Sequence, residues 1–261
     1  MTKVLIINPH YGDYALKYFE CAPKEVYNYL VQEGEDVVII EDDATPEKLR
    51  AYILNHPEIE HIYGMGHGSK DTYTVINGEP FLSTNLNLDL VKGRVISLLS
   101  CLTAKELGPT IIKEAGATAY FGYSEEVITV PVPTPCGSRF AVAPLVGDIE
   151  KEKSLHAKKD YMECYKDAIS KWNEEIDYWR EHYDEETYDS TPVTEEMAAD
   201  IINKIIHNRD CFTLLLSGSL PPSPPPSPPP SPMLEIILSM LSITALGGLI
   251  MHQTKALSRW F

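Results

Sequence analysis

Short apolar runs recur along the first 218 residues, and segments with helical periodicity separate them. The runs are rich in Val, Ile and Leu, which is typical of strands buried on both faces of a sheet. They span Val4–Ile7, Val37–Ile40, His61–Met65, Val95–Ser100, Thr118–Gly122 and Phe212–Leu216. Helical patterns lie between them at Pro23–Gln32, Pro46–Asn55 and Ala104–Ala115. This alternation predicts an α/β fold, with a mainly parallel sheet covered by helices on both faces.

The pattern changes to a long helical period in residues 147–210. Apolar and aromatic side chains recur there at steps of three and four, which predicts an amphipathic helix. They are Tyr161, Tyr165, Ala168, Trp172, Ile176, Trp179 and Tyr183. We interpret 147–210 as an acidic helical insert, between a core at 1–146 and a last core strand at 211–218. Its acidic face is either simply solvated or a regulatory surface for a basic partner or a divalent cation.

Prolines dominate the next segment. Pro221–Pro232 reads PPSPPPSPPPSP, which predicts a polyproline II rod about 3 Å long per residue. We interpret 219–233 as a spacer. The alternative is a docking site for a reader domain of the SH3 type.

An uncharged stretch from Ile236 to Met251 follows the rod. Residues 234–251 predict a transmembrane helix near the lower length limit, and the alternative is an amphipathic helix on a membrane or on the domain. The tail at 252–261 carries Lys255, Arg259 and Trp260, which suit a membrane interface.

The amino terminus does not resemble a signal peptide, because its apolar run is only four residues long. We therefore expect a single-pass C-terminal anchor with the globular domain in the cytoplasm. The basic tail indicates the opposite orientation, because the positive-inside rule would place the tail, and not the globular domain, in the cytoplasm.

Composition narrows the function classes. The chain has 261 residues and a formal net charge of −16. Clustered Lys and Arg are needed to bind phosphates, so this charge argues against nucleic acid as a partner. Five cysteines, widely spaced and odd in number, indicate neither a disulfide framework nor a zinc site. We expect no metal and no cofactor.

Two predicted strands each deliver a reactive residue at their carboxyl end. His67 follows His61–Met65, and Cys101 follows Val95–Ser100. If these strands are neighbours, His67 and Cys101 share one edge of the sheet, and an imidazole there can activate a thiol. The N–H groups of Gly68 and Cys101 would then form an oxyanion hole. Taken singly, the cysteine reads as a small buried hydrophobe, and the glycine-rich segment Gly64–Gly68 as a turn or a phosphate-binding loop.

The order of these blocks resembles the caspase-like (clan CD) cysteine peptidases, which include caspases, legumains, gingipains, clostripain and separase. In that clan a hydrophobic block precedes His-Gly, and a second hydrophobic block precedes the Cys. The separation of 34 residues between His67 and Cys101 is similar to the gingipain, clostripain and CHAT-type branch. The resemblance implies a caspase-like sandwich and a protein or peptide substrate, with Cys101 as nucleophile and His67 as general acid/base. Leu102-Thr103 differs from the caspase pattern, so specificity for Asp is not implied.

In this clan, the residue that selects the P1 side chain often follows the first strand. Asp13 is the carboxylate there, and it either selects Arg or Lys at P1 or caps the next helix. Lys151, Lys153, Lys158 and Lys159 lie in a polar stretch that self-cleavage could reach.

Other classes fit the sequence less well. A glutamine-amidotransferase-like domain needs glycines around its Cys and a His later in the chain. A flavodoxin-like domain would use Gly64–Gly68 to bind a ligand. A catalytically silent caspase-like module that signals by binding is separated from a peptidase only by activity.

Overall fold

The computed structural model describes residues 3–9, 16–130, 136, 139–188 and 191–218. Contacts divide the chain into Met1–Pro224 and Pro225–Phe261, and the second unit lies outside the described residues. The predicted proline rod at 219–233, span at 234–251 and tail at 252–261 therefore lie outside them too. Within the ranges described, no helix combines the length and the apolar character needed to cross a membrane.

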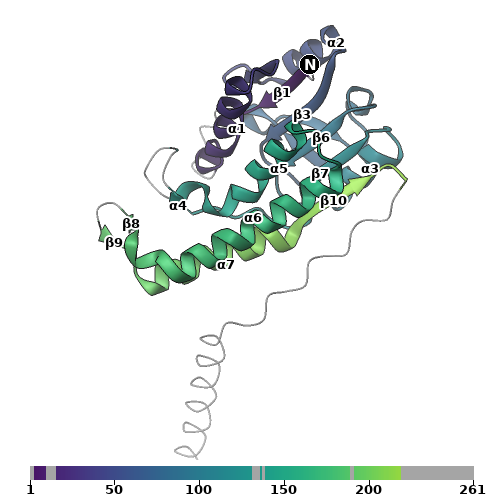
Figure 1. Ribbon diagram of the computed structural model, residues 1–261. Helices are drawn as coiled ribbons and strands as arrows, with labels where there is room; N and C mark the ends of the chain where they lie inside the picture. Colours follow the sequence, from purple (N-terminus) through teal and green to yellow (C-terminus); the bar gives the residue numbers. More distant parts are fainter. Residues whose placement is uncertain (1–2, 10–15, 131–135, 137–138, 189–190, 219–261) are drawn as a thin grey trace, which may run out of the picture. The chain divides into compact units, whose positions relative to one another are not determined.

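The centre of the described domain is a sheet of six strands. These are β1 (Lys3–Ile7), β2 (Val37–Ile40), β3 (Ile59–Met65), β6 (Val95–Leu99), β7 (Ala119–Tyr123) and β10 (Phe212–Leu216). They lie in the order β10-β7-β6-β3-β1-β2 (Figure 1). All neighbours are parallel except β10, which runs antiparallel to β7. The predicted α/β fold with a mainly parallel sheet is confirmed.

Two layers cover the sheet, because alternate side chains of each strand point to opposite faces. Val4 and Ile6 of β1 pack into one core, and Leu5 and Ile7 pack into the other. The first layer holds α1 (Cys21–Gln32), α4 (Arg139–Val142), α5 (Val146–His156), α6 (Tyr161–His182) and α7 (Glu195–Cys211). The second holds α2 (Pro46–Asn55), α3 (Leu107–Lys113) and a hairpin of β4 (Thr72–Thr74) and β5 (Pro80–Ser83). A small ribbon, β8 (Thr187–Tyr188) with β9 (Thr191–Pro192), lies between α6 and α7 in the chain.

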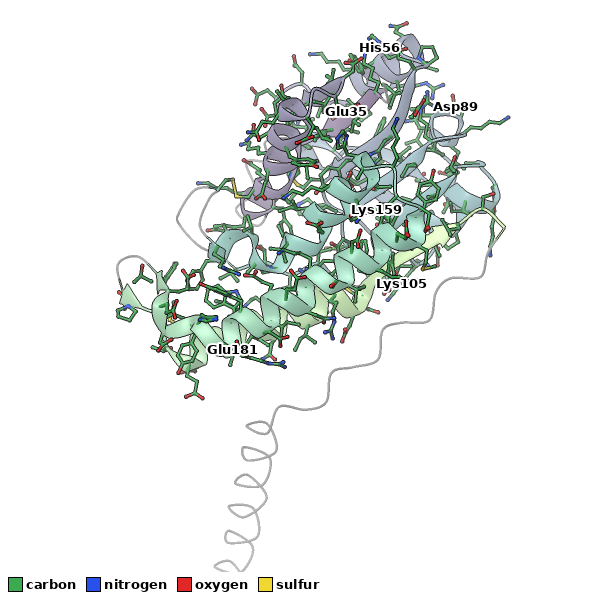
Figure 2. The ribbon with its side chains drawn as sticks, in the orientation of Figure 1. Glu35, His56, Asp89, Lys105, Lys159 and Glu181 are labelled. Carbon is green, nitrogen blue, oxygen red and sulfur yellow. A yellow bond between two sulfur atoms is a disulfide. The ribbon has the colours of Figure 1, made fainter. Side chains whose placement is uncertain are left out.

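Helix α6 is amphipathic, as predicted. Asp160 and Glu163 form a capping box that starts it. Trp172 and Trp179 are fully buried, and Trp172 meets Phe212 of β10 edge-on at 5.2 Å between ring centroids. Acidic side chains such as Glu181 face solvent (Figure 2). The helices of residues 147–210 therefore share one hydrophobic core with the sheet.

A charged cluster is buried between α5 and the sheet. Lys151 is fully buried, and its Nζ lies 2.8 Å from both Asp148 Oδ1 and Glu152 Oε1. The Tyr63 hydroxyl of β3 donates to Asp148 Oδ2 at 2.8 Å. Lys151 therefore does not lie in an exposed stretch, and the suggestion that self-cleavage could reach it is wrong.

His61 at the start of β3 joins this cluster, and its burial predicts acid sensitivity. Burial lowers the pKa of His61 below 6.5, against the opposing attraction of Glu152. Below pH 6.5 the unfolded chain therefore binds a proton that the folded chain resists, so the free energy of unfolding should fall as the pH drops. His61→Gln should flatten this slope below pH 6.5. Urea unfolding at several pH values measures it, with His182→Gln on the surface of α6 as the control. An equal slope in the wild type and His61→Gln would contradict the prediction.

Candidate active site

The predicted histidine and cysteine leave the sheet at the same edge. Strands β3 and β6 are parallel neighbours, and Met65 pairs with Leu99. The Gly66 N–H donates to the Leu99 carbonyl at 3.3 Å, which extends the pairing past the strand end. His67 and Cys101 each follow two residues after this matched pair. The expected adjacency of the two strands is confirmed.

Gly68 brings the two segments into direct contact. A methyl group built on Gly68 would lie 2.3 Å from Ser100 Oγ and 2.4 Å from the Cys101 carbonyl oxygen. Real Cβ atoms are not found so close to other heavy atoms, so only glycine fits here without a shift of the backbone. The His67-Gly68 segment therefore packs directly against the backbone of Cys101.

The hairpin β4–β5 holds the His67 segment in place. The Thr74 N–H donates to the His67 carbonyl at 2.9 Å, and the Ser69 N–H donates to the Thr72 carbonyl at 2.8 Å. The buried Tyr73 hydroxyl donates to the Met65 carbonyl at 3.0 Å. The sequence analysis did not predict this hairpin, although Asn77-Gly78, both at positive φ, is a typical hairpin turn between its two strands.

A sharp turn presents Cys101. Leu102 has a φ of +65°, in the left-handed region that costs a residue with a Cβ roughly 1–2 kcal/mol. The Leu102 N–H donates to the Glu125 carbonyl at 3.0 Å, which fixes the turn against the segment after β7. The Val127 N–H donates to Cys101 Sγ at 3.4 Å. One backbone hydrogen bond therefore reaches the thiol itself, and a second fixes the turn that carries it.

The resting thiol of Cys101 is protonated. Burial raises the pKa of Cys101 above 9.0, the charge of Glu126 adds to this, and the Val127 N–H opposes it. A protonated thiol is a weak nucleophile, so a base must take its proton as it attacks.

The segment that carries the expected oxyanion donor Gly68 packs against the backbone of Cys101. Among the described residues, no acceptor takes the backbone N–H of Gly68 or of Cys101. Asp13, the expected P1-selecting carboxylate, lies outside the described residues.

The other cysteines have different roles. Cys164 and Cys211 are buried, and burial raises the pKa of each to about 12. Cys21 and Cys136 form a disulfide across 115 residues of sequence (Figure 2). The expectation of no disulfide is wrong for this pair, because spacing along the chain does not report distance in space. In the part of the chain that is described, no group of three His, Cys, Asp or Glu side chains could hold a metal ion.

Comparison with known proteins gives a weak structural likeness. No family model matches the chain, and no curated protein matches it. Two solved structures are similar: the Arg-specific cysteine proteinase gingipain R (RgpB), and the complex of the pro- and mature domains of RgpB from Porphyromonas gingivalis. Each is 15% identical over 66% of this chain, with a TM-score of 0.45. The match spans 43% of the first protein and 44% of the second, so it leaves more than half of each unmatched.

Proposed function

We propose that this chain is a cysteine endopeptidase of the caspase-like type, with Cys101 as nucleophile and His67 as general acid/base. The observation that carries the proposal is the β3–β6 register, which sets both residues two positions beyond one matched pair. The packing of Gly68 against the Cys101 carbonyl supports it further.

The proposed reaction starts from a neutral thiol. His67 takes the proton as Cys101 Sγ attacks the peptide carbonyl carbon, and the N–H groups of Gly68 and Cys101 stabilise the oxyanion. The intermediate collapses to a thioester as His67 passes the proton to the leaving amine. Water, deprotonated by His67, then attacks the thioester, and the departing sulfur regains a proton. The cycle needs no metal or cofactor. We propose Asp13 as the carboxylate that favours Arg or Lys at P1.

Replacement of His67 tests the proposal. His67→Ala should lower kcat/KM for a cleaved peptide by about 10²–10⁴-fold, the usual contribution of a general acid/base. The assay uses the full chain and peptides with basic or acidic P1 residues, and His56→Ala is the control. A peptide that the wild type and His67→Ala cleave at the same rate would contradict the assignment.

A catalytically silent binding module is the second candidate. The raised pKa of Cys101 favours it, because a thiol that stays protonated does not attack. In the same assay, this candidate predicts that the wild type cleaves no peptide faster than His67→Ala does.

A flavodoxin-like site has less support. Gly64 lies inside β3, and the chain continues from β3 into the β4–β5 hairpin. A phosphate-binding loop would normally lead into a helix N-terminus.

The chain beyond the domain carries further proposals. We propose that 234–251 anchors the protein in a membrane and that Pro221–Pro232 spaces the domain from it, either alone or with a reader of the SH3 type bound.

The expected cytoplasmic placement of the domain conflicts with the Cys21–Cys136 bond, because disulfides persist in oxidising compartments. The basic tail agrees with the disulfide under the positive-inside rule. We therefore propose an oxidising compartment for the domain. Alkylation after denaturation without reductant, on protein taken from its native cells, should then leave two of the five cysteines unmodified by mass.

A further inference from the structure

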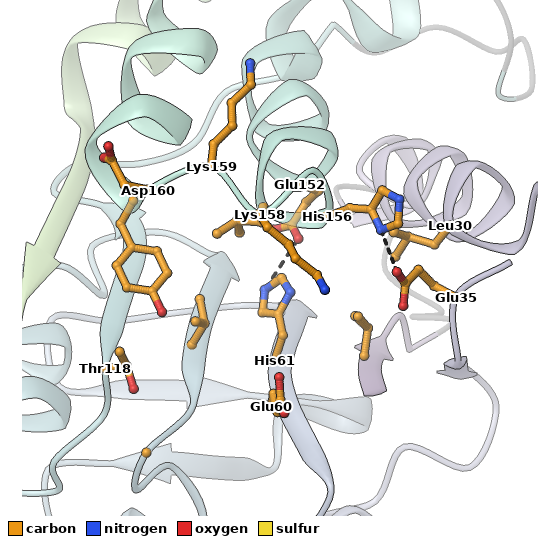
Figure 3. A pocket seen from close by; sticks show the side chains of 15 residues that line it. Leu30, Glu35, Glu60, His61, Thr118, Glu152, His156, Lys158, Lys159 and Asp160 are labelled. Atoms are coloured by element: carbon orange, nitrogen blue, oxygen red, sulfur yellow. Dashed lines mark ion pairs between the residues drawn. The ribbon is translucent and has the colours of Figure 1, made fainter. Parts of the chain in front are cut away.

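A cavity of about 560 Å³ lies at the sheet edge opposite His67 and Cys101 (Figure 3). Its floor is built from the amino ends of four neighbouring strands, through Val4, His61, Val95 and the residue before β7, Thr118. The end of α5 and the turn into α6 cover it, and Leu30 and Glu35 close one side. Its volume is in the range of small-molecule sites. At about 3.3 Å per residue, the strands put it some 15–20 Å from the candidate active site.

The wall under α5 carries excess negative charge. Asp148 and Glu152 are each at most 2% exposed and share the single ammonium of Lys151. His61 Nε2 lies 3.4 Å from Glu152 Oε2 and 3.1 Å from Ser97 Oγ. Burial lowers the pKa of His61, so near pH 7 its ring is neutral and does not balance the second carboxylate. Two buried carboxylates therefore share one ammonium beside the cavity.

A further carboxylate, Glu35, lines the same cavity. Glu35 Oε1 lies 3.1 Å from His156 Nδ1. Glu35 Oε2 is buried and has no hydrogen-bond partner among the described residues. A buried carboxylate oxygen without a donor is costly, and a ligand that donates an N–H there would remove this cost.

Two lysines line the rim of the cavity, and they differ in their partners among the described residues. Lys158 has a φ of +57° and reaches toward His61 from the turn between α5 and α6 (Figure 3). It forms no ion pair with any described residue. Lys159 points away and pairs with Asp167 at 2.8 Å, and Asp160 caps α6. With the buried cluster included, the carboxylates of Asp148, Glu152, Glu35 and Glu60 outnumber the ammonium groups of Lys151 and Lys158 around the cavity.

We propose that this cavity binds a small organic cation with a primary ammonium group and an apolar body. The ammonium lies between Glu35 and Glu152, where it donates to Glu35 Oε2 and balances the buried charge. The apolar body packs on Val4, Leu30, Val95 and Leu155, which line the same cavity. Lys158 is the side chain that must swing away to admit it.

Binding of n-pentylamine, n-pentanol and pentanoate tests the charge preference of the cavity. Titrations use the full chain, followed by calorimetry, in both the wild type and Cys101→Ala. We expect pentylamine to bind at least about tenfold more tightly than pentanol, and pentanoate to bind least. Equal affinity in Cys101→Ala separates this site from the proposed peptidase site. Absence of pentylamine binding, equal binding of amine and alcohol, or preference for pentanoate would each overturn the proposal.

Two variants then locate the amine. Glu35→Gln should weaken pentylamine binding about tenfold, and Glu181→Gln on the exposed face of α6 should leave it unchanged. Lys158→Ala should tighten it about two- to fivefold, since it removes a like charge. An anion in the cavity would respond to Lys158→Ala in the opposite direction. Weaker pentylamine binding in Lys158→Ala, or unchanged binding in a folded Glu35→Gln, would overturn the proposal.

Discussion

Cys101→Ala is expected to lower peptide hydrolysis by roughly 10⁴-fold or more, the scale seen when a catalytic nucleophile is removed. Alanine keeps the backbone of the turn at Leu102 and deletes only the sulfur. The half-buried side chain makes little contribution to the core, so the unfolding midpoint should change by only a few degrees. Initial rates on the best peptide of the basic-P1 and acidic-P1 panel, with a thermal melt of the same sample, measure both quantities.

The matched control is Cys164→Ala. Cys164 is a free thiol on the buried face of α6, so its loss should reduce stability by about 1 kcal/mol and leave the rate unchanged. Equally low cleavage rates in the wild type and Cys101→Ala, across the whole panel, would contradict the peptidase proposal. Equal loss of activity in both cysteine variants would instead point to damage of the fold.

Lys151→Met is expected to reduce the free energy of unfolding by about 3–5 kcal/mol. Methionine fills a similar volume but leaves Asp148 and Glu152 buried without the ammonium that both contact at 2.8 Å. This loss is large beside the total stability of about 5–15 kcal/mol that is typical of a domain. Urea unfolding followed by tryptophan fluorescence suits the measurement, because Trp172 and Trp179 are buried in the same core.

Lys153→Met, two residues along α5, provides the control. Lys153 is partly exposed and pairs with Glu25 at 3.6 Å, so its replacement should cost about 0–1 kcal/mol. Similar losses in both variants would mean that the buried cluster contributes no more than a surface pair. The triple variant Lys151→Met, Asp148→Asn and Glu152→Gln should recover part of the loss, since it removes the unpaired charges.

The sheet could be predicted from sequence because its strands are buried on both faces. A run such as Val4–Ile7, which is buried throughout, is read as a strand once helices flank it. The same reasoning located the candidate site, since strands ending in His67-Gly68 and Cys101 bring these residues together only if β3 and β6 are neighbours. The amphipathic character of α6 could also be predicted, because its aromatic side chains recur at helical spacing and two of them are tryptophans that need a large apolar surface to pack on.

Features that depend on distance in space could not be predicted. Lys151 has charged neighbours in sequence, which is the pattern of a solvated helix face, and only the tertiary structure buries it against Tyr63. Cys21 and Cys136 are 115 residues apart, and nothing in their spacing indicates a bond. The β4–β5 hairpin was missed because its strands are three and four residues long and partly polar. The cavity at the amino edge likewise combines residues from three strands and three helices.

The central claim, that Cys101 is a nucleophile activated by His67, is tested most directly by covalent labelling. Acyloxymethyl ketone probes with Arg, Lys or Asp at P1 are incubated with the full chain, and the labelled residue is located by peptide mass spectrometry. The account predicts one label per chain, on Cys101, fastest with the Arg or Lys probe and slowed at least about 100-fold by His67→Ala. Labelling of Cys101 that is slow and unchanged by His67→Ala, or no labelling at all, would contradict it.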